Sequence, residues 1–373
     1  MNKCKLGDVA EVIISNVDKK SYENEEKVKL CNFTDVYYNW AITLRNVPNL
    51  MIATATRNEI NKYTLHKGDV AITKDSETKE DIGQSTYIAD EITDMLLGYH
   101  CALIRPNVDK LLGSYLNAVL HTKLATRYFE LNASGSGQRY TLSVDAINDF
   151  QLYLPSLDEQ RRISKLLTDI DKKIEANTAI NDNLEQVIKS CFGFMFATRK
   201  PNGIINDILQ EHPKSTIQVN DSLGILGDYP FFTSGETINE WQTALVDGMN
   251  CYLSTGGNAS IKGYYGKAAY STDTWCVYGK GKYSFYLFCY LKSIIRCIND
   301  SFFAGSGLKH LQKDSLLLVN LYIPTEKELE KFNSIAEPAM KTMAKLFIEN
   351  KKLKQQRDFL LPLLMNGQAT IAE

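Results

Sequence analysis

The chain contains one internal repeat, and this repeat constrains its fold more than any other feature of the 373 residues. A Gly-Ser-Gly run at 135–137 recurs at 305–307, and a Leu-Tyr-x-Pro segment at 152–155 recurs at 321–324. A Tyr-Leu pair opens an apolar, helix-like stretch before each Gly-Ser-Gly run. Landmarks that return in the same order, at an offset of 169 to 171 residues, indicate a single duplication.

A long charged helix pattern follows the proline of each copy. Its apolar residues alternate by four and three, which is the heptad spacing that keeps one stripe of a helix against a partner helix. The expected seam residues are Ile163, Leu167, Ile170, Ile174, Asn181, Leu184 and Ile188 in the first copy, and Met343, Leu346, Asn350 and Leu353 in the second. Asn181 and Asn350 lie one repeat apart, and a buried seam Asn specifies register at a cost in stability.

The two helices are expected to pack against each other as an antiparallel coiled coil. A forty-residue helix would be roughly 60 Å long, which exceeds the width of one domain. The alternative, in which each seam packs on its own domain, remains open. We expect Pro338 to interrupt the second helix near its start because proline lacks an N–H. Gly367 suits a helix C-terminus.

The remaining segments predict mixed α/β (α+β) globular units. Short β-like runs with turn residues between them, such as 68–73 and 250–254, accompany the helix before each Gly-Ser-Gly run. The clearest linker is 197–203. We therefore expect a duplicated globular domain separated by two long helices, with bounds of 1–155 for the first domain, 156–198 for the central helix, 199–324 for the second domain and 325–373 for the distal helix.

Composition does not reveal a partner or a reaction. Lys plus Arg number 42 and Asp plus Glu number 44, so bulk charge does not indicate a nucleic-acid binder. The sequence has no Walker-type loop, dinucleotide fingerprint, Gly-x-Ser-x-Gly elbow, His-Glu-x-x-His pair or Asn/Asp-Pro-Pro-Tyr motif. We therefore expect no catalytic residues in this chain.

Cysteine usage and the apolar segments predict a reduced, cytoplasmic protein. The eight cysteines are scattered without a Cys-x-x-Cys pair, and the five histidines do not complete a zinc site, so no metal is expected. Residues 1–8 lack the apolar region of a signal peptide. The most apolar stretch, 283–295, is too short to cross a membrane.

The order of these motifs resembles the specificity (S) subunits of type I restriction–modification systems. The elements that carry the resemblance are Lys5–Ala10, Gly68–Lys74, Pro155 followed by Glu159–Ile163, Asp228–Gly235, Ser254–Ala259 and Arg357–Gln368. One departure is that the second unit opens with Gly203–Ile208, which lacks the usual Leu-Gly-Asp.

The resemblance implies that two target-recognition domains each read one half of a split DNA sequence. It also implies that the paired helices act as a spacer and dock two methyltransferase (M) subunits, with restriction (R) subunits added outside. S-adenosylmethionine, ATP and Mg would be bound by those partners, and this chain would be non-catalytic with no cofactor of its own. We further expect the isolated chain to bind DNA weakly and to bind more tightly with its methyltransferase.

Polar side chains on loops are the candidates for DNA contact, because base edges carry the sequence information while phosphates position the protein. The candidates are Thr73, Lys74, Gln84, Ser136, Gln138 and Arg139 in the first unit, and Thr255, Asn258, Lys262, Lys267, Ser306, Lys309 and His310 in the second. The alternative function is a duplicated coiled-coil scaffold that binds proteins, which would have no salt-dependent affinity for DNA.

Overall fold

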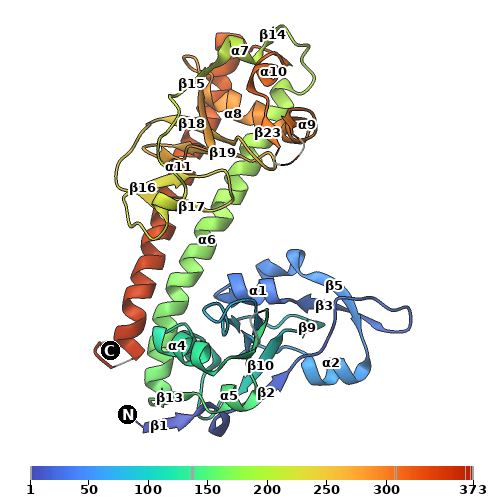
Figure 1. The fold of residues 1–373 in the computed structure, drawn as a ribbon, viewed down its shortest axis with the longest axis vertical. Coiled ribbons are helices and arrows are strands. Elements are labelled where there is room, and N and C mark those ends of the chain that lie inside the picture. The colour runs from blue at the N-terminus through green and yellow to red at the C-terminus, as the bar shows by residue number, and fades with distance from the viewer. Residues whose placement is uncertain are drawn as a thin grey trace. The chain divides into compact units, whose positions relative to one another are not determined.

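In a computed structural model the chain forms two compact units (Figure 1). Unit 1 consists of residues 1–174 and 352–373, and unit 2 of residues 175–351. The structure describes residues 2–135, 138–305, 307, 309–365, 367–369 and 371. Both units mix helices with sheets, as predicted. Within the described residues, no helix has the combination of length and apolar character needed to cross a membrane.

Unit 1 is built around a five-stranded sheet in the order β2-β10-β6-β8-β4. Its central strands, β10 and β6, are buried along nearly their whole length. Three smaller sheets accompany it: a two-stranded sheet of β1 and β13, and three-stranded sheets in the orders β5-β3-β9 and β11-β12-β7. The elements are β1 (Asn2–Lys5), η1 (Leu6–Asp8), β2 (Ala10–Ile14), β3 (Glu26–Cys31), α1 (Phe33–Tyr38), β4 (Ala41–Ile42), η2 (Leu44–Asn49), β5 (Met51–Ala55), α2 (Arg57–Tyr63), β6 (Val70–Thr73), β7 (Asp75–Ser76), β8 (Ser85–Ile88), β9 (Met95–Leu97), β10 (Cys101–Pro106), α3 (Gly113–Leu120), α4 (Lys123–Asn132), β11 (Ser134–Gly135), β12 (Tyr140–Thr141), α5 (Val144–Asn148), β13 (Gln151–Leu154) and the first part of α6 (Leu157–Phe196).

Unit 2 is built around a four-stranded sheet in the order β15-β21-β18-β19. A second sheet has the order β17-β16-β20, and the pairs β14-β24 and β22-β23 complete the unit. Its elements after α6 are β14 (Gly203–Ile204), α7 (Ile205–Ile208), β15 (Leu209–Glu211), η3 (Asn220–Ser222), β16 (Tyr229–Phe232), β17 (Ile238–Trp241), β18 (Met249–Ser254), β19 (Ile261–Tyr265), β20 (Ala269–Tyr270), β21 (Thr274–Gly279), α8 (Ser284–Ser293), α9 (Ile295–Ser301), β22 (Phe303–Ala304), β23 (His310–Leu311), α10 (Lys313–Leu317), β24 (Asn320–Leu321) and α11 (Glu326–Met365).

The sequence repeat is also a repeat of structure. The series β10-α3-α4-β11-β12-α5-β13-α6 in the first copy matches β21-α8-α9-β22-β23-α10-β24-α11 in the second. The same side-chain contact holds each copy together: the Tyr115 hydroxyl donates to the Tyr153 carbonyl at 3.1 Å, and the Tyr286 hydroxyl donates to the Tyr322 carbonyl. The first strand of each copy also begins in the same way, by pairing with the strand before the long helix.

The second unit keeps the opening turn of the first although it lacks the Leu-Gly-Asp sequence. In unit 1 the Asp8 carboxylate accepts the backbone N–H of Lys5 at 3.2 Å, and in unit 2 the Asp207 carboxylate accepts that of Ile204 at 2.9 Å. An acidic residue three positions on satisfies an N–H that a helix start leaves unpaired. One aspartate therefore suffices to preserve the turn.

The two long helices pack in antiparallel fashion, which confirms the predicted coiled coil. In unit 1 the start of α6, with Ile163 and Leu167, shares a core with Leu364 near the end of α11. In unit 2 the end of α6 meets the start of α11, and the Phe192 and Phe332 ring centroids lie 6.1 Å apart. Each helix also packs on the sheet and helices of the unit it crosses, so the alternative packing that we left open occurs as well.

The predicted seam residues are covered to different degrees. The buried ones are Ile163, Leu167 and Ile188, and the partly buried ones are Ile170, Ile174, Asn181, Leu184, Met343, Leu346, Asn350 and Leu353.

Our expectation that Pro338 interrupts the second helix is wrong, because α11 runs unbroken through it. Pro338 and Ser334 are both exposed, so water can reach the Ser334 carbonyl that loses its intrahelical donor. The expected C-terminal stop is present: Gly367 has a φ of +66°, and the Gln368 N–H donates to the Leu363 carbonyl at 2.9 Å.

The seam asparagines are not equivalent in the structure. The Asn177 side-chain amide donates to the Asn350 side-chain oxygen at 2.9 Å and to the Glu349 carboxylate at 3.0 Å. Asn181, the repeat counterpart of Asn350, has a buried side-chain oxygen without a hydrogen-bond partner among the described residues. The asymmetry arises because the position one repeat after Asn177 is Leu346.

We predict opposite effects on stability from removing the two asparagines of the repeat. Asn350→Leu should lower the free energy of unfolding by about 1–2 kcal/mol, because it removes a partner from the buried Asn177 amide. Asn181→Leu should raise it by about 1 kcal/mol, because it removes a buried oxygen that has no partner. Urea unfolding midpoints measure both, and equal shifts in one direction would contradict the asymmetry.

Candidate nucleic-acid interface

In unit 1 the structure brings two distant candidate segments together. The β11-β12 hairpin, which carries the Gly-Ser-Gly run, pairs with β7 just beyond the end of β6. Tyr140 lies opposite Ser76 and Thr141 opposite Asp75, and the Leu142 N–H donates to the Lys74 carbonyl at 2.8 Å. The residues after β6 and those of the hairpin therefore form one surface.

A buried ion cluster fixes this hairpin to β7. The Asp75 carboxylate accepts the Lys74 ammonium at 2.8 Å and lies 2.6 Å from His100 Nδ1. Burial alone would raise the pKa of Asp75, but hydrogen bonds from Lys74, Thr141 and His100 outweigh burial and lower the pKa to about 2. Asp75 therefore stays charged and joins β7, β12 and the turn before β10 at one point.

The candidates of unit 1 differ in what remains available for DNA. Thr73 is buried, and its hydroxyl accepts the Gln84 N–H at 3.0 Å, while Gln84 itself is partly buried. Lys74 is largely buried against Asp75. Gln138 and Arg139 are exposed. Ser136 lies outside the described residues.

Unit 2 repeats the arrangement with its Gly-rich loop, 254–260. Gly256 forms a bridge with His310, the Gly257 N–H donates to the Lys309 carbonyl at 3.0 Å, and the Leu311 N–H donates to the Thr255 carbonyl at 3.0 Å. The Gly-rich loop and the strand after the second Gly-Ser-Gly run therefore lie side by side, as the two candidate segments of unit 1 do.

Some unit 2 candidates also have internal partners. The Lys262 ammonium donates to the Thr233 carbonyl at 3.1 Å and to the Gly235 carbonyl, and burial lowers the pKa of Lys262. The Thr255 hydroxyl donates to the Asp273 carbonyl at 2.8 Å. These contacts tie the Gly-rich loop and β19 to the neighbouring loops.

The other unit 2 candidates are exposed, but one lies apart. Asn258, Lys309 and His310 are exposed at the Gly-rich loop and β23. Lys267 is exposed as well, but it lines a depression with Tyr229 and residues 242–247, beside the β17-β16-β20 sheet. Ser306 lies outside the described residues.

Sequence reasoning missed a polar group beside the Gly-rich loop. The Trp275 indole N–H donates to the Glu211 carboxylate at 2.6 Å, and the Lys313 ammonium sits 4.7 Å above the Trp275 ring. Burial lowers the pKa of Lys313, which lines one depression together with Trp275 and Thr255. The sequence feature that could have pointed to this group is the position of Lys313, two residues after Leu311 and at the start of a helix.

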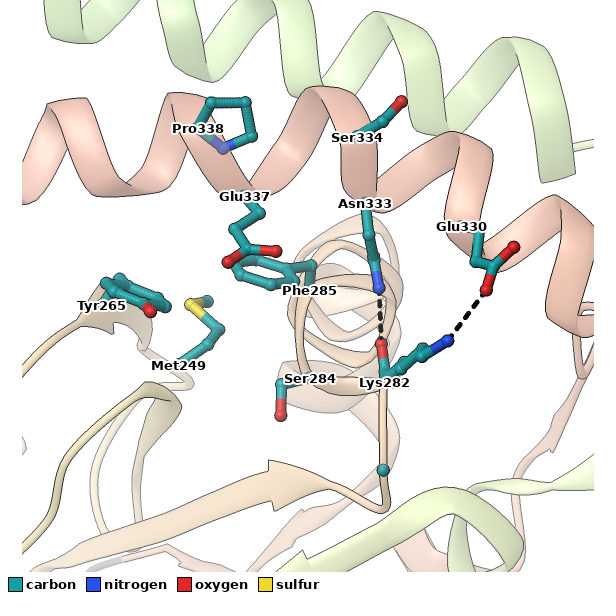
Figure 2. Close-up of a pocket in the computed structure, with 11 residues that line it drawn as sticks. Met249, Tyr265, Lys282, Ser284, Phe285, Glu330, Asn333, Ser334, Glu337 and Pro338 are labelled. Carbon is teal, nitrogen blue, oxygen red and sulfur yellow. Dashed lines mark hydrogen bonds and ion pairs between the residues drawn. The ribbon is translucent and has the colours of Figure 1, made fainter.

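A pocket elsewhere in unit 2 is lined by side chains that make structural contacts. Figure 2 shows Lys282 directed toward Glu330 and Asn333 reaching the Lys282 carbonyl, with Phe285 and Met249 to the left of these contacts. The Lys282–Glu330 ion pair measures 2.8 Å, and the Asn333 amide donates to the Lys282 carbonyl at 2.8 Å. These contacts fasten α11 to the start of α8. Across the part of the chain that the structure describes, no three His, Cys, Asp or Glu side chains gather as a metal site.

The sequence and the fold are similar to those of type I restriction specificity subunits. Residues 1–186 match the family model described as the type I restriction modification DNA specificity domain. The chain is 28% identical over 199 residues to the type I restriction enzyme HindI specificity subunit of Haemophilus influenzae, covering 52% of this chain and 40% of that protein. It is 26% identical over 148 residues to the EcoDI specificity subunit of Escherichia coli, covering 39% of this chain and 33% of that protein.

The fold extends the likeness to nearly the whole chain. The crystal structure of a type I restriction–modification S subunit from M. genitalium superposes with a TM-score of 0.60 at 12% identity, covering 98% of this chain and 96% of that one. The chain belongs to the family of type I restriction–modification specificity subunits. The alignments span less than half the length of the two curated relatives.

We predict that Asp75→Asn loosens the hairpin of unit 1. Loss of the charge should cost about 2 kcal/mol of stability, from the difference between the ordinary Asp pKa and about 2. Amide exchange at 134–142, followed by mass spectrometry, should quicken. Glu77→Gln, which removes an exposed charge two residues away, should leave exchange unchanged.

The effect should also depend on pH in a defined direction. Because folding lowers the pKa of Asp75, the contribution of its charge to stability is complete above about pH 4 and is lost as the pH falls through 2. The free energies of unfolding of wild type and Asp75→Asn should therefore differ at pH 6 and converge near pH 2. A difference that grew on acidification would contradict the ion cluster.

Proposed function

We propose that this chain is the DNA sequence-recognition subunit of a type I restriction–modification complex, and that each unit reads one half of a bipartite target. One observation carries the proposal. In both copies of the repeat, a polar loop and the strand that follows the Gly-Ser-Gly run are hydrogen-bonded into one surface. Duplication of a reading surface is what a two-part target requires.

The exposed residues on these surfaces have the chemistry of base readout. Arginine and lysine can bind the two acceptors of guanine, while glutamine and asparagine can pair with adenine. Unit 1 offers Gln138 and Arg139, and unit 2 offers Asn258, Lys309 and His310. Thr73, Lys74 and Lys262 then act by positioning the loops, because their polar atoms are bound internally.

In the same proposal the paired helices are the spacer between the two reading units and the docking site for two methyltransferase subunits. Restriction subunits then join this complex. The chain is non-catalytic in this proposal, and S-adenosylmethionine, ATP and Mg are bound by the partners. A cytoplasmic location is part of the same proposal, and it is consistent with eight cysteines that are all free thiols.

The decisive experiment is co-expression with a type I methyltransferase subunit from the same genome, followed by genome-wide mapping of methylated adenines. A split motif that is lost when this chain is omitted is the expected result. The scaffold alternative predicts no motif that depends on this chain. It also predicts no fall in DNA affinity as the salt concentration rises, whereas a protein that contacts DNA phosphates loses affinity steeply with salt.

We predict that single substitutions change the reading of one half of the target only. Arg139→Ala should relax the base preference in the half of the target that unit 1 reads. Lys309→Ala should do the same in the half that unit 2 reads. Each loss should be about 10- to 100-fold in discrimination, because a base contact contributes about 1–3 kcal/mol. Methylation mapping of the variants measures this.

Arg57→Ala is the matched control, since Arg57 is an exposed arginine of unit 1 that pairs with Glu26 away from the hairpin. It should leave the motif unchanged. If Arg139→Ala altered both halves equally, the assignment of one half-site to each unit would have to be given up.

A further inference from the structure

Unit 2 contains an apolar groove that its own side chains leave open. It has a volume of about 660 Å³ and lies between the second half of α6, α8 and α11. Its walls include Ile188, Phe192, Phe288, Cys289 and Met343. Polarisable sulfur and aromatic walls of this kind favour an aromatic occupant.

The same position in unit 1 is filled by a tryptophan. The Trp40 ring stacks on His121 with centroids 4.3 Å apart, and the Arg357 guanidinium lies over the Trp40 ring at 4.5 Å from its centroid. The Asn117 side-chain amide donates to the Trp40 carbonyl at 3.0 Å. Trp40 thus sits between the end of α3 and the last part of α11.

The internal repeat relates this site to the groove residue by residue. Tyr115 and Tyr286 make the same contact in the two copies, which fixes the correspondence of α3 with α8. Asn117 and His121 then correspond to Phe288 and Lys292, and Arg357 of α11 corresponds to Ile188 of α6. All three unit 2 counterparts line the groove. The open groove is therefore the place that Trp40 occupies in the other copy.

The rim of the groove carries positive charge. Lys189 is exposed and has no ion-pair partner among the described residues. Within the described residues the ion-pair partner of Lys292 is Glu185, which also lines the groove and lies 3.9 Å away. An incoming segment with acidic residues beside its apolar side chain would complement this rim.

We propose that a partner protein inserts a bulky aromatic side chain, flanked by acidic residues, into this groove. The inference rests on the proposed function, and the partner is the methyltransferase subunit. The aromatic side chain of the partner then fills the groove of unit 2, as Trp40 fills the corresponding site of unit 1. A buried aromatic anchor of this type dominates the energy of an interface.

Gly193→Trp tests the proposal by filling the groove from within. Gly193 lines the groove, and nothing lies within 4 Å of the position that a Cβ would take, so a side chain can start there without a backbone clash. The matched control is Ser190→Trp, at an exposed position on α6 that does not line the groove. Full-length chains are titrated with purified methyltransferase subunit, and 5-fluoroindole is used separately as a probe observed by fluorine NMR.

We expect Gly193→Trp to weaken methyltransferase binding at least tenfold and to abolish line broadening of 5-fluoroindole. Wild type and Ser190→Trp should behave alike in both measurements. Lys189→Glu should weaken methyltransferase binding, and Lys189→Arg should not. Circular dichroism of each variant shows that the chain remains folded.

Other outcomes overturn the inference in distinguishable ways. If 5-fluoroindole does not bind wild type, the groove does not accept an aromatic ring. If the methyltransferase binds Gly193→Trp as tightly as wild type, it does not occupy the groove, although the proposed function stands. If wild type binds no methyltransferase, the proposed function fails and the partner assignment falls with it. If wild type is a dimer and Gly193→Trp a monomer, the occupant is a second copy, and the assignment to a methyltransferase is wrong.

Discussion

The core of each unit is completed by a helix that belongs to the other half of the sequence. Leu361, Leu364 and Met365 of α11 belong to the core of unit 1, and Phe192 and Phe196 of α6 to that of unit 2. Burial of each large apolar side chain contributes about 1.5–3 kcal/mol. Neither long helix is therefore a passive connector, since removal of either would open an apolar core.

The polar loops depend on these cores, but each unit holds them by different chemistry. Unit 1 uses a charged cluster, in which Asp75 binds Lys74 and His100. Unit 2 uses a lysine, Lys262, that donates to backbone carbonyls. In both units some candidate residues are consumed in positioning the loop, and their neighbours remain exposed. A site held on fixed strands loses less conformational entropy when it binds than a site on free loops.

The long-range order of the chain could be predicted from the sequence, but its short contacts could not. Heptad periodicity over forty residues is a strong signal, so the two helices and their pairing were predictable. Strands of two residues, such as β7 and β12, have no periodicity at all, and nothing in the sequence pairs Tyr140 with Ser76. The positions of Gln138 and Arg139 beside the end of β6 therefore required the structure.

The seam shows a subtler limit of sequence reasoning. The repeat relates Asn181 to Asn350, and this relation is correct in sequence. In an antiparallel pair, however, a residue early in one helix meets a residue late in the other. The partner of Asn350 is therefore Asn177, and not its repeat counterpart. Pro338 misleads for a related reason, because its cost depends on whether water reaches the unpaired carbonyl, which the sequence does not state.

Divergence of the two copies explains why the same frame can support different surfaces. A duplicated helix pair starts with two identical grooves, and each copy can cover its own groove only with the residues its insertions supply. Unit 1 supplies Trp40 from the segment before β4, and Arg357 and His121 both lie against its ring. At the same positions unit 2 has Ile188 and Lys292, which leave an apolar floor with a charged rim. Covering the groove from within stabilises one unit by itself, whereas leaving it open makes the other unit's stability depend on what binds there.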